Sequence, residues 1–428
     1  MIETLLDKIE ELTFRKNSRN SSVPPSKDEN RPLKNQSLRT RSGKRAGGQP
    51  GHQGSTLEMA ADPDQVIDHR PDFCNCCGND LSNAPQELLQ KRQVVDIPVI
   101  LPSYTEHRVF GKICSCGHRN RSVFPENIRT TISYGPNIQA TVAYMHTRQY
   151  LPFERMGEFF RDVCNLPISQ GTISNILNGF AVKARPAYNL IAEKVSNAKV
   201  VGTDETGIRV NGKNNWFWTW QSKFSTYVVF SKNRGAATIG DNFPKGFNDA
   251  VLVHDCWASH FLAQCKTHQL CIAHLLRELI FLEERFGSEW ATGLKGILYE
   301  ALELKKNLGR EHYGKPIPER ERIKTALKVL LESPLPENQK KLRVFHKRMI
   351  KHKEYILTFL HHFHVPPDNN ASERAIRNVK VKQKVSGQFK TENGAQVYAV
   401  IRSVTDTCIK NGQNVLGAFK TIAILKPE

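Results

Sequence analysis

The chain has 428 residues, and its 61 Lys and Arg against 42 Asp and Glu give a formal net charge of +19. This length predicts two or three domains with ample material for a buried core. No run reaches the roughly 18 apolar residues of a membrane span, and no signal-peptide core is present, so we expect a cytoplasmic protein without membrane contact. The positive charge favours a polyanionic partner, above all nucleic acid.

The first 60 residues predict a short helix followed by an arm. Apolar side chains recur at helical spacing over residues 1–14, from Ile2 to Leu12. Residues 15–60 are rich in Asn, Ser, Pro, Gly, Lys and Arg, and such a composition cannot bury a core. We therefore predict a disordered basic arm, which either contacts phosphate groups or serves as a solvated linker.

Clustered cysteines in residues 61–128 predict a zinc-binding module. Without a secretion signal, the ten cysteines of the chain should be reduced thiols, so their clustering indicates a metal. A glycine near each cysteine pair permits the tight turn that directs two thiolates to one tetrahedral ion. Because the second pair is C-x-C instead of C-x-x-C, Cys76 and His118 are alternative ligands. The predicted ligands of a structural Zn²⁺ are Cys74, Cys77, Cys114 and Cys116.

Residues 129–195 predict helices, which we assign to DNA binding. Within them, residues 153–163 and 170–180 predict a helix, a short turn and a second helix, with Ser169 as N-cap. This unit could place its second helix in a DNA major groove. Ordinary helical packing is the alternative, because the second helix carries no Lys or Arg to contact bases.

Residues 196–428 predict an α/β catalytic domain. Strand and helix patterns follow one another in the order β-β-β-α-β-α-β, which is typical of an RNase H-like fold. Residues 287–364 are Lys-rich with a helical pattern, and they predict a helical insertion in this domain. The predicted strands cover residues 199–204, 215–221, 226–231, 250–255 and 269–274, and the predicted helices cover residues 235–243, 275–286, 370–385 and 393–410.

Three carboxylates stand at the ends of these elements: Asp204 and Asp255 close apolar strands, and Glu373 opens a helix. Carboxylate oxygens are the ligands that Mg²⁺ prefers, so three converging acids could hold two such ions for phosphodiester chemistry. Side chains alternate across a strand, so Asp204 and Glu205 face opposite ways. We select Asp204 because Gly202 shares its face and leaves room for a bulky ligand, which makes Glu205 a supporting or surface acid.

Each carboxylate has a structural alternative. Asp204 and Asp255 could be strand-end turn residues, although Asp255 follows an apolar run where an unpaired charge would be costly. Glu373 could complete a capping box with Asn370 as N-cap. A metal ligand beside a DNA backbone is favoured, because cations follow Glu373 on the same helical face at spacings of four, three and four. We predict DNA contacts for Arg374, Arg377, Lys380 and Lys384.

Cys271 and His274 suggest a further metal site, but two ligands are too few, and a strand would turn these side chains to opposite faces. We therefore expect His274 to brace the insertion or the neighbouring strand instead of taking part in catalysis.

Together these motifs resemble the transposases of the insertion-sequence-66 family, which are bacterial enzymes of the DDE type. The resemblance implies that Asp204, Asp255 and Glu373 form the DDE triad, with 50 residues between the first two and 117 between the last two. The C-x-C spacing of the second cysteine pair departs from the pattern. The resemblance covers nearly the whole chain and rests on residues 20–26, 47–52, 74–118, 204–206, 254–255, 271–274 and 369–374.

The resemblance implies a DNA transposase with two Mg²⁺ or Mn²⁺ ions per site. Such an enzyme binds the terminal repeats of its element, hydrolyses a phosphodiester bond there and uses the freed 3′-hydroxyl to attack target DNA. Synapsis of two ends implies at least a homodimer, accessory proteins of the same element are further expected partners, and the expected location is the bacterial nucleoid. The alternatives are a catalytically inactive DNA-binding protein derived from a transposase, and a nuclease that does not join ends.

Overall fold

The computed structural model describes residues 16–17, 19–21, 57–126, 128, 130–336 and 339–426. The helix expected at residues 1–14 and nearly all of the arm expected at residues 15–60 lie outside the described residues. The chain divides into two compact units, one made of Pro32–Ile100 and the other of Met1–Arg31 with Leu101–Glu428. Every helix and strand of the described residues belongs to the second, larger unit.

Residues 57–100 form neither a helix nor a named strand, and none of their side chains is buried. Their most regular feature is a turn at Cys74, whose carbonyl accepts a hydrogen bond from the Gly78 N–H at 2.9 Å. An antiparallel bridge between Phe73 and Asp80 closes this turn. The segment therefore has no apolar core of its own.

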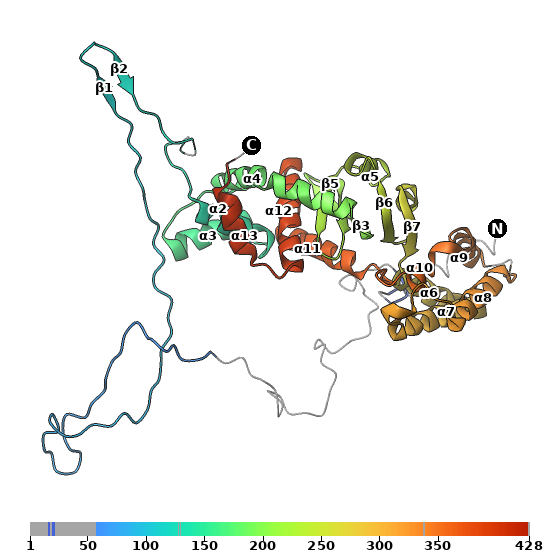
Figure 1. The fold of residues 1–428 in the computed structure, drawn as a ribbon, viewed down its shortest axis with the longest axis horizontal. Coiled ribbons are helices and arrows are strands. Elements are labelled where there is room, and N and C mark those ends of the chain that lie inside the picture. Colours follow the sequence, from blue (N-terminus) through green and yellow to red (C-terminus); the bar gives the residue numbers. More distant parts are fainter. Residues whose placement is uncertain are drawn as a thin grey trace. The chain divides into compact units, whose positions relative to one another are not determined.

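A mixed five-stranded sheet forms the centre of the larger unit (Figure 1). The order across it is β5-β4-β3-β6-β7, with β3, β4 and β5 antiparallel and with β6 and β7 parallel to β3. A two-residue turn at Asn211 and Gly212, both with positive φ, joins β3 to β4 as a tight hairpin requires. The strands are β3 (Val200–Val210), β4 (Lys213–Gln221), β5 (Thr226–Ser231), β6 (Phe247–His254) and β7 (Cys265–Leu270).

The predicted α/β class and the antiparallel meander of three strands are confirmed. The strand predicted at residues 269–274 is wrong at its end, because β7 stops at Leu270 and the helix α6 starts at Ile272. The short apolar run at this point fits a buried strand and a helix start equally well, so periodicity does not separate them.

Helices precede, interrupt and follow the sheet. The Ser169 side chain caps α4, as predicted, by accepting a hydrogen bond from the Thr172 N–H. No strand occurs within residues 287–336 and 339–364, and no helix of the described residues is long and apolar enough to cross a membrane. The helices are α2 (Pro136–Thr147), α3 (Phe153–Cys164), α4 (Gln170–Ser196), α5 (Ala237–Asn242), α6 (Ile272–Phe286), α7 (Glu289–Asn307), α8 (Pro318–Glu332), α9 (Lys340–Lys351), α10 (Thr358–His361), α11 (Asn370–Ser386), α12 (Glu392–Lys410) and α13 (Val415–Ile424).

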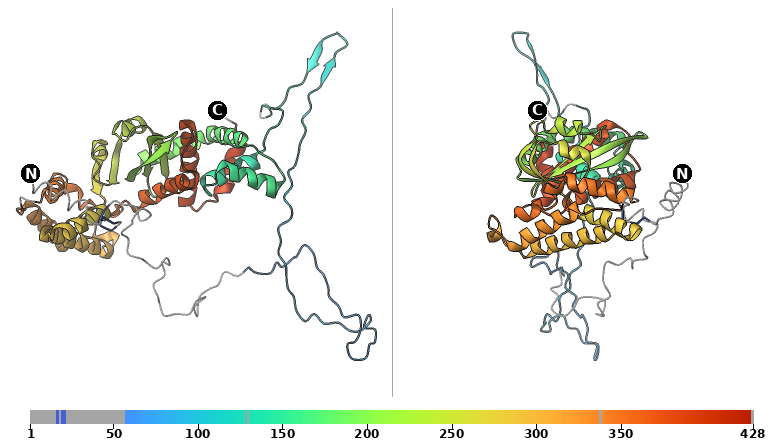
Figure 2. Two further views of the ribbon diagram at one scale, coloured as in Figure 1. Left: turned by 180° about the vertical axis from the view of Figure 1, so that it is seen from behind. Right: turned by 90° about the vertical axis from the view of Figure 1, so that its right-hand side faces the viewer.

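Three apolar clusters hold the helices against both faces of the sheet. The largest packs α2, α4, α12 and α13 against one face, where Trp218 and Trp220 of β4 are fully buried. The second packs α6 to α10 against Val251 and Val253 on the opposite face of β6. The third joins α11 and α12 to Ile208 near the end of β3. Figures 1 and 2 show α4 and α12 beside β5, and α6 to α10 grouped near β7.

A buried polar network around Arg402 links α2 to α12. Arg402 of α12 is fully buried and donates hydrogen bonds to both oxygens of Asp406 and to the Thr147 carbonyl at 2.7 Å. Its guanidinium also donates to the Tyr150 hydroxyl at 3.2 Å, and that hydroxyl donates to Asn378 of α11 at 2.8 Å. The helices before the sheet and those after it are therefore joined through one buried polar network.

Candidate active site

The register of the parallel strands brings Asp204 and Asp255 to one edge of the sheet. Gly202 of β3 pairs with Val253 of β6. Two residues further along each chain stand Asp204 and Asp255, and alternation along a strand directs both to the face that Gly202 and Val253 share. Asp255 directly follows β6, and Asp204 stands just beyond the part of β3 that pairs with β6. The prediction that a strand ends at Asp204 is wrong, because β3 continues to Val210 through its antiparallel pairing with β4.

Glu373 reaches the same edge from the first turn of α11. The N-cap of α11 is Asn369 instead of Asn370, and the Asn369 side chain donates a hydrogen bond to the Thr203 carbonyl of β3 at 2.6 Å. Glu373 does not fold back on the helix start; its Oε1 accepts a hydrogen bond from Arg277 of α6 at 2.8 Å. The capping-box alternative for Glu373 is therefore wrong.

Gly202 allows α11 to approach β3 closely. A Cβ at this position would lie 2.7 Å from the Ser372 Oγ and 2.8 Å from the Asn369 Oδ1, both at the start of α11. Both of these side chains are buried. The expectation that Gly202 leaves room for a bulky ligand is wrong, because α11 fills that space. The glycine instead permits the contact that positions Glu373.

Negative charge accumulates around Asp204. Burial raises the pKa of Asp204 well above its ordinary value of 3.8, and the charges of Glu205, Asp255 and Glu373 raise it further. The Asp204 Oδ1 accepts a hydrogen bond from the Glu205 N–H at 2.9 Å, which offsets part of this effect. A carboxylate in such surroundings binds a proton or a cation readily.

Glu205, on the opposite face of β3, belongs to a buried charge cluster. Its side chain is 2% exposed and pairs with Arg234 at 2.9 Å and with His260 at 3.2 Å. The His260 Nε2 also lies 3.6 Å from the Asp255 Oδ1, so the imidazole stands between the two acids. Burial opposes ionisation of Glu205, but His260 and Arg234 outweigh it and lower the pKa of Glu205. Glu205 is therefore not a surface acid.

Sequence reasoning missed Arg234 and His260. Arg234 lies in the loop before α5 and stacks on Trp257, with 3.8 Å from the guanidinium carbon to the ring centroid. His260 lies in a 3₁₀ turn over Ala258–Leu262. The Trp257 N–H donates a hydrogen bond to the Asp255 Oδ1 at 2.9 Å, which orients that carboxylate. Loop residues show no periodicity, and only their short distance along the chain from Asp255 could have indicated Trp257 and His260.

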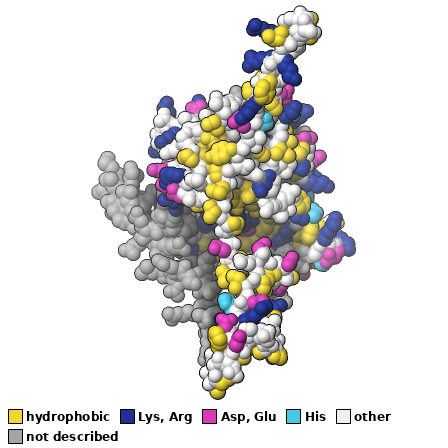
Figure 3. Space-filling model, turned by 90° about the vertical axis from the view of Figure 1, so that its left-hand side faces the viewer, with side chains coloured by type: hydrophobic (Ala, Val, Ile, Leu, Met, Phe, Trp, Pro, Cys, Tyr) yellow, Lys and Arg dark blue, Asp and Glu magenta, His cyan; other side chains and the backbone are white. Residues whose placement is uncertain are grey.

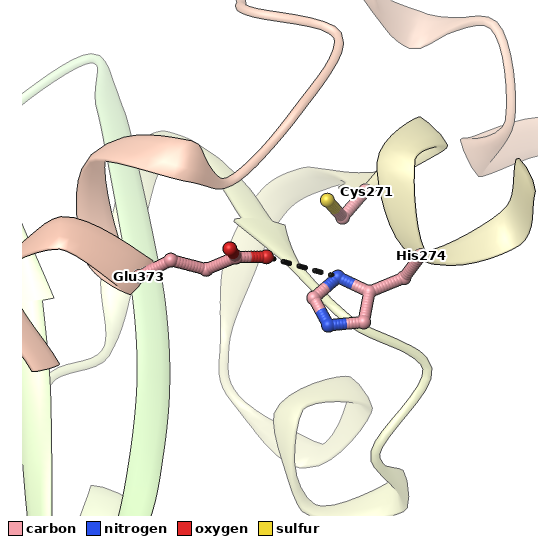
Figure 4. Close-up of side chains that lie close together, drawn as sticks. All are labelled: Cys271, His274 and Glu373. Carbon is pink, nitrogen blue, oxygen red and sulfur yellow. Dashed lines mark ion pairs between the residues drawn. The ribbon is translucent and has the colours of Figure 1, made fainter. Parts of the chain in front are cut away.

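Cys271 and His274 lie on the same side of α6, beside Glu373 (Figure 4). Cys271 is the N-cap of α6 and His274 is in its first turn, and residues three apart on a helix are neighbours. One potential ligand atom from each of the three residues lies within 4.8 Å of the other two. The expectation that Cys271 and His274 face opposite ways is wrong, because it assumed a strand.

The cationic residues predicted after Glu373 occupy exposed positions of α11. The Lys380 Nζ donates a hydrogen bond to the Gly207 carbonyl at 2.6 Å, and Arg377 lies 3.9 Å from Glu373. The helix therefore has an apolar face that packs on the sheet and a cationic face that starts at Glu373. The exposed residues include Arg374, Arg377, Lys380 and Lys384, and the buried ones are Ser372, Ala375, Ile376, Val379 and Lys382.

The two cysteine pairs form similar turns. The Cys74 carbonyl accepts a hydrogen bond from the Gly78 N–H at 2.9 Å, and the Cys114 carbonyl accepts one from the Gly117 N–H at 2.8 Å. Both glycines have positive φ. Backbone N–H groups later in each turn lower the pKa of the Cys74 and Cys114 thiols. The first pair belongs to the smaller unit of the chain and the second pair to the larger one.

The second pair lies in a cationic hairpin. Its strands are β1 (Gly111–Ile113) and β2 (Arg119–Arg121), which pair antiparallel with Lys112 opposite Asn120. All side chains of both strands are exposed. In Figure 3, Lys and Arg side chains in dark blue lie along the hairpin at the top of the view. A two-stranded ribbon of this kind has dimensions that a DNA major groove admits.

The fold and the site define an α/β protein with acidic side chains near the central strand of a mixed sheet. The sequence model of the Transposase IS66 family matches residues 131–397, which is more than half of the chain and includes all three acids. The chain belongs to the IS66 transposase family. It is thus a transposase by family, and DNA is the partner that this class implies. A second match, over residues 1–58, is to a family of unknown function, DUF6444, and no curated protein matches the chain.

Proposed function

We propose that this transposase binds the ends of its insertion sequence, cleaves phosphodiester bonds there and joins the freed 3′-hydroxyl ends to target DNA. In this proposal Asp204, Asp255 and Glu373 hold the divalent metal ions of the reaction. The observation that supports it is that the charges of Asp255 and Glu373 both raise the pKa of the half-buried Asp204, so the two acids act on it electrostatically. The strand order β5-β4-β3-β6-β7, with one acid on β3 and one directly after β6, supports an RNase H-like domain.

The residues at this edge fit two Mg²⁺ or Mn²⁺ ions. They are carboxylates, and burial together with the charges of neighbouring acids raises the pKa of Asp204, an effect that a bound cation would oppose. When bound, such ions lower the pKa of a bound water and stabilise the charge that develops on phosphate oxygens. Trp257 orients Asp255 and Arg277 orients Glu373 through hydrogen bonds, so both carboxylates are held in place by the protein itself.

The cationic face of α11 would hold the DNA backbone beside the acids. It begins in the same helical turn as Glu373, and Lys and Arg contacts to phosphates fix the position of a duplex without reading its sequence. A phosphate bound along α11 would place the next phosphates of the strand near the sheet edge. No protein nucleophile is needed, because water and then the 3′-hydroxyl attack phosphorus.

End recognition is assigned to the segments before the sheet. We include a structural Zn²⁺ bound by the two cysteine pairs, because both pairs form the tight turn with a glycine of positive φ that zinc sites use. The cationic hairpin, and the helix, turn and helix of α3 and α4, are the elements proposed to contact the terminal repeats. Pairing of two ends would require at least a dimer, and accessory proteins of the element could join it.

The test is cleavage and joining of a labelled duplex that carries the element end, by purified protein in Mg²⁺ and in EDTA. We expect Asp255→Asn and Glu373→Gln to lower the cleavage rate at least about a thousandfold, because a metal clamp contributes several kcal/mol to the transition state. End binding should remain. Asp249→Asn is the matched control and should cleave normally, because Asp249 is an exposed acid on β6, the strand that Asp255 follows.

Three outcomes separate the alternatives. Cleavage by Asp255→Asn at the wild-type rate contradicts the assignment of the acids. Specific binding with no cleavage by the wild type favours the inactive DNA-binding protein. Metal-dependent cleavage without joined products, when a free 3′-hydroxyl end and target DNA are supplied, favours a plain nuclease.

A further inference from the structure

We propose that Cys271, His274 and Glu373 bind a Zn²⁺ ion that ties the start of α6 to the start of α11. The site is separate from the zinc proposed for the cysteine turns. It rests on the proposed function only through Glu373, which would be shared with the ions that act on DNA. Its role would be to position Glu373 at the edge of the sheet.

The first argument for the site is the spacing of the candidate ligand atoms. The His274 Nδ1 lies 3.7 Å from the Glu373 Oε1, which is too far for a hydrogen bond. Two ligands of a tetrahedral zinc ion, with bonds of 2.0–2.2 Å, are about 3.4 Å apart. In Figure 4 the carboxylate and the imidazole face each other, and the Cys271 sulfur lies on the same side. The three ligand atoms are therefore nearly spaced for one ion between them.

The second argument for the site is the buried Nδ1 atom of His274. The His274 Nδ1 is buried and has no hydrogen-bond partner in the part of the chain that the structure describes. A buried polar atom without a partner costs about 1–3 kcal/mol. A metal ion in front of this nitrogen would remove that cost, because the neutral imidazole would donate its lone pair.

Cys271 has the surroundings of a metal-binding thiolate. Its side chain is 1% exposed, and its Sγ accepts a hydrogen bond from the Asn369 N–H at 3.2 Å. Burial raises the pKa of the Cys271 thiol to about 12, and the Asn369 N–H lowers it only in part, so without a cation the sulfur keeps its proton. A bound ion would displace that proton to solvent, and the N–H donor would help to hold the thiolate. Asn369 is also the residue that anchors α11 to β3, so the sulfur is held next to the helix that carries Glu373.

The donor set decides the kind of ion. One sulfur, one imidazole nitrogen and one carboxylate oxygen suit Zn²⁺, whereas Mg²⁺ prefers oxygen ligands alone. Arg277 donates to the Glu373 Oε1, but a carboxylate oxygen has two lone pairs and the second oxygen stays available. Three protein ligands would leave one position of a tetrahedral ion for water.

The test is the zinc content of the full-length protein. Wild type, Cys271→Ser, His274→Ala and Cys408→Ser are saturated with Zn²⁺, separated from free ion and analysed for zinc per chain. Cys408 is the matched control, because it is a buried cysteine in the apolar cluster of α12. We expect Cys271→Ser and His274→Ala to hold one ion fewer than wild type, and Cys408→Ser to hold the same number. With Co²⁺ as the probe, both site variants should also lose the part of the thiolate-to-cobalt absorption that Cys271 contributes, while the part from the two cysteine pairs remains.

Equal zinc content in all four proteins overturns the proposal. If Cys271→Ser fails to fold, His274→Ala still decides, since the His274 side chain is 24% exposed and its removal leaves a smaller defect. The measurement involves no DNA, so a protein that never cleaves DNA can still bind this zinc. Conversely, normal Mg²⁺-dependent cleavage together with equal zinc content contradicts this inference alone and leaves the proposed function standing.

Discussion

The sheet edge and the cysteine segment carry the two sets of metal ligands predicted from the sequence, and they are built in opposite ways. At the sheet edge the acids stand on strands and a helix whose apolar faces are buried in three clusters. In residues 57–100 no side chain is buried, and the cysteines stand in turns held by backbone hydrogen bonds. Apolar packing can hold like charges together before an ion binds. A segment without a core would depend on the proposed ion for its fold.

The largest expected effect tests how strongly the packed region is held. Arg402→Ala leaves Asp406 as a buried, unpaired charge, and we expect it to lower the free energy of unfolding by about 3–5 kcal/mol. Replacing both partners, as Arg402→Met with Asp406→Leu, should recover most of this loss. Denaturant midpoints measure both, with the exposed Lys420→Ala of α13 as control. An Arg402→Ala protein as stable as that control would contradict the role given to this network.

Gly202→Ala tests whether packing positions the acids. The added Cβ would lie 2.5 Å from the Gln221 Nε2. It would also lie 2.7 Å from the Ser372 Oγ and 2.8 Å from the Asn369 Oδ1 at the start of α11, so these neighbours must move. We expect a loss of about 1–3 kcal/mol in stability and more than tenfold in DNA cleavage, because Glu373 is displaced. Gly207→Ala, on the same strand with open space around its Cβ, is the control. Equal cleavage by the two variants would show that α11 tolerates the shift.

A smaller expected effect concerns the charge of Asp204 at the edge of the sheet. The folded chain raises the pKa of Asp204, so the folded state binds a proton more tightly than the unfolded state. The stability this contributes is full below the ordinary pKa of 3.8 and is lost as pH rises through the folded pKa. In EDTA, we therefore expect Asp204→Asn to exceed wild type in Tm by about 2–4 °C at the upper end of pH 4–8.

Added Mg²⁺ should close this gap by stabilising only the wild type. Thermal unfolding across the pH series, with and without the ion, measures it. If the Tm of the two proteins changes with pH in the same way in EDTA, the folded chain does not raise the pKa of Asp204. Asp249→Asn should follow the wild type throughout.

The smallest expected effect concerns the cysteine segment. Cys77→Ser should release the proposed zinc and weaken binding to the element end, yet it should change the main unfolding transition by less than about 0.5 kcal/mol, because the three apolar clusters contain no residue of this segment. Circular dichroism and zinc analysis measure the two responses. A large fall in the main Tm would show that the cysteine segment and the sheet stabilise each other.

The sequence alone was enough to propose the three acids, but it was not enough to find the residues that surround them. Asp204 and Asp255 follow short apolar runs, and this pattern is visible without a structure, although β3 continues past Asp204 to Val210. The reason for Gly202 was not visible, because the side chains that fill its space come from α11, far along the chain. Arg234 and His260 lie in loops without periodicity, so nothing in the sequence connected them to Glu205.

The error at Cys271 has a similar cause. Residues 270–273 are apolar and follow a strand pattern, and the change from strand to helix falls inside that run. A shift of the boundary by a few residues moves His274 from one side of an element to the other. The third partner, Glu373, lies 102 residues after Cys271 and 99 after His274, so no local pattern could have brought the three together.

The contact between Asn369 and Cys271 also bears on how the chain closes on itself. It joins the residue before α6 to the residue before α11, and the Ile272 N–H donates to the Pro367 carbonyl at the same point. The chain from α6 to α10 is thus a loop whose two ends meet. The entropy of closing such a loop grows only with the logarithm of its length, by roughly 0.6 kcal/mol for each doubling. Residues could therefore be added to or removed from the exposed turn at Arg310–His312 without moving Glu373, and the number of residues between the second and third acids is free to vary.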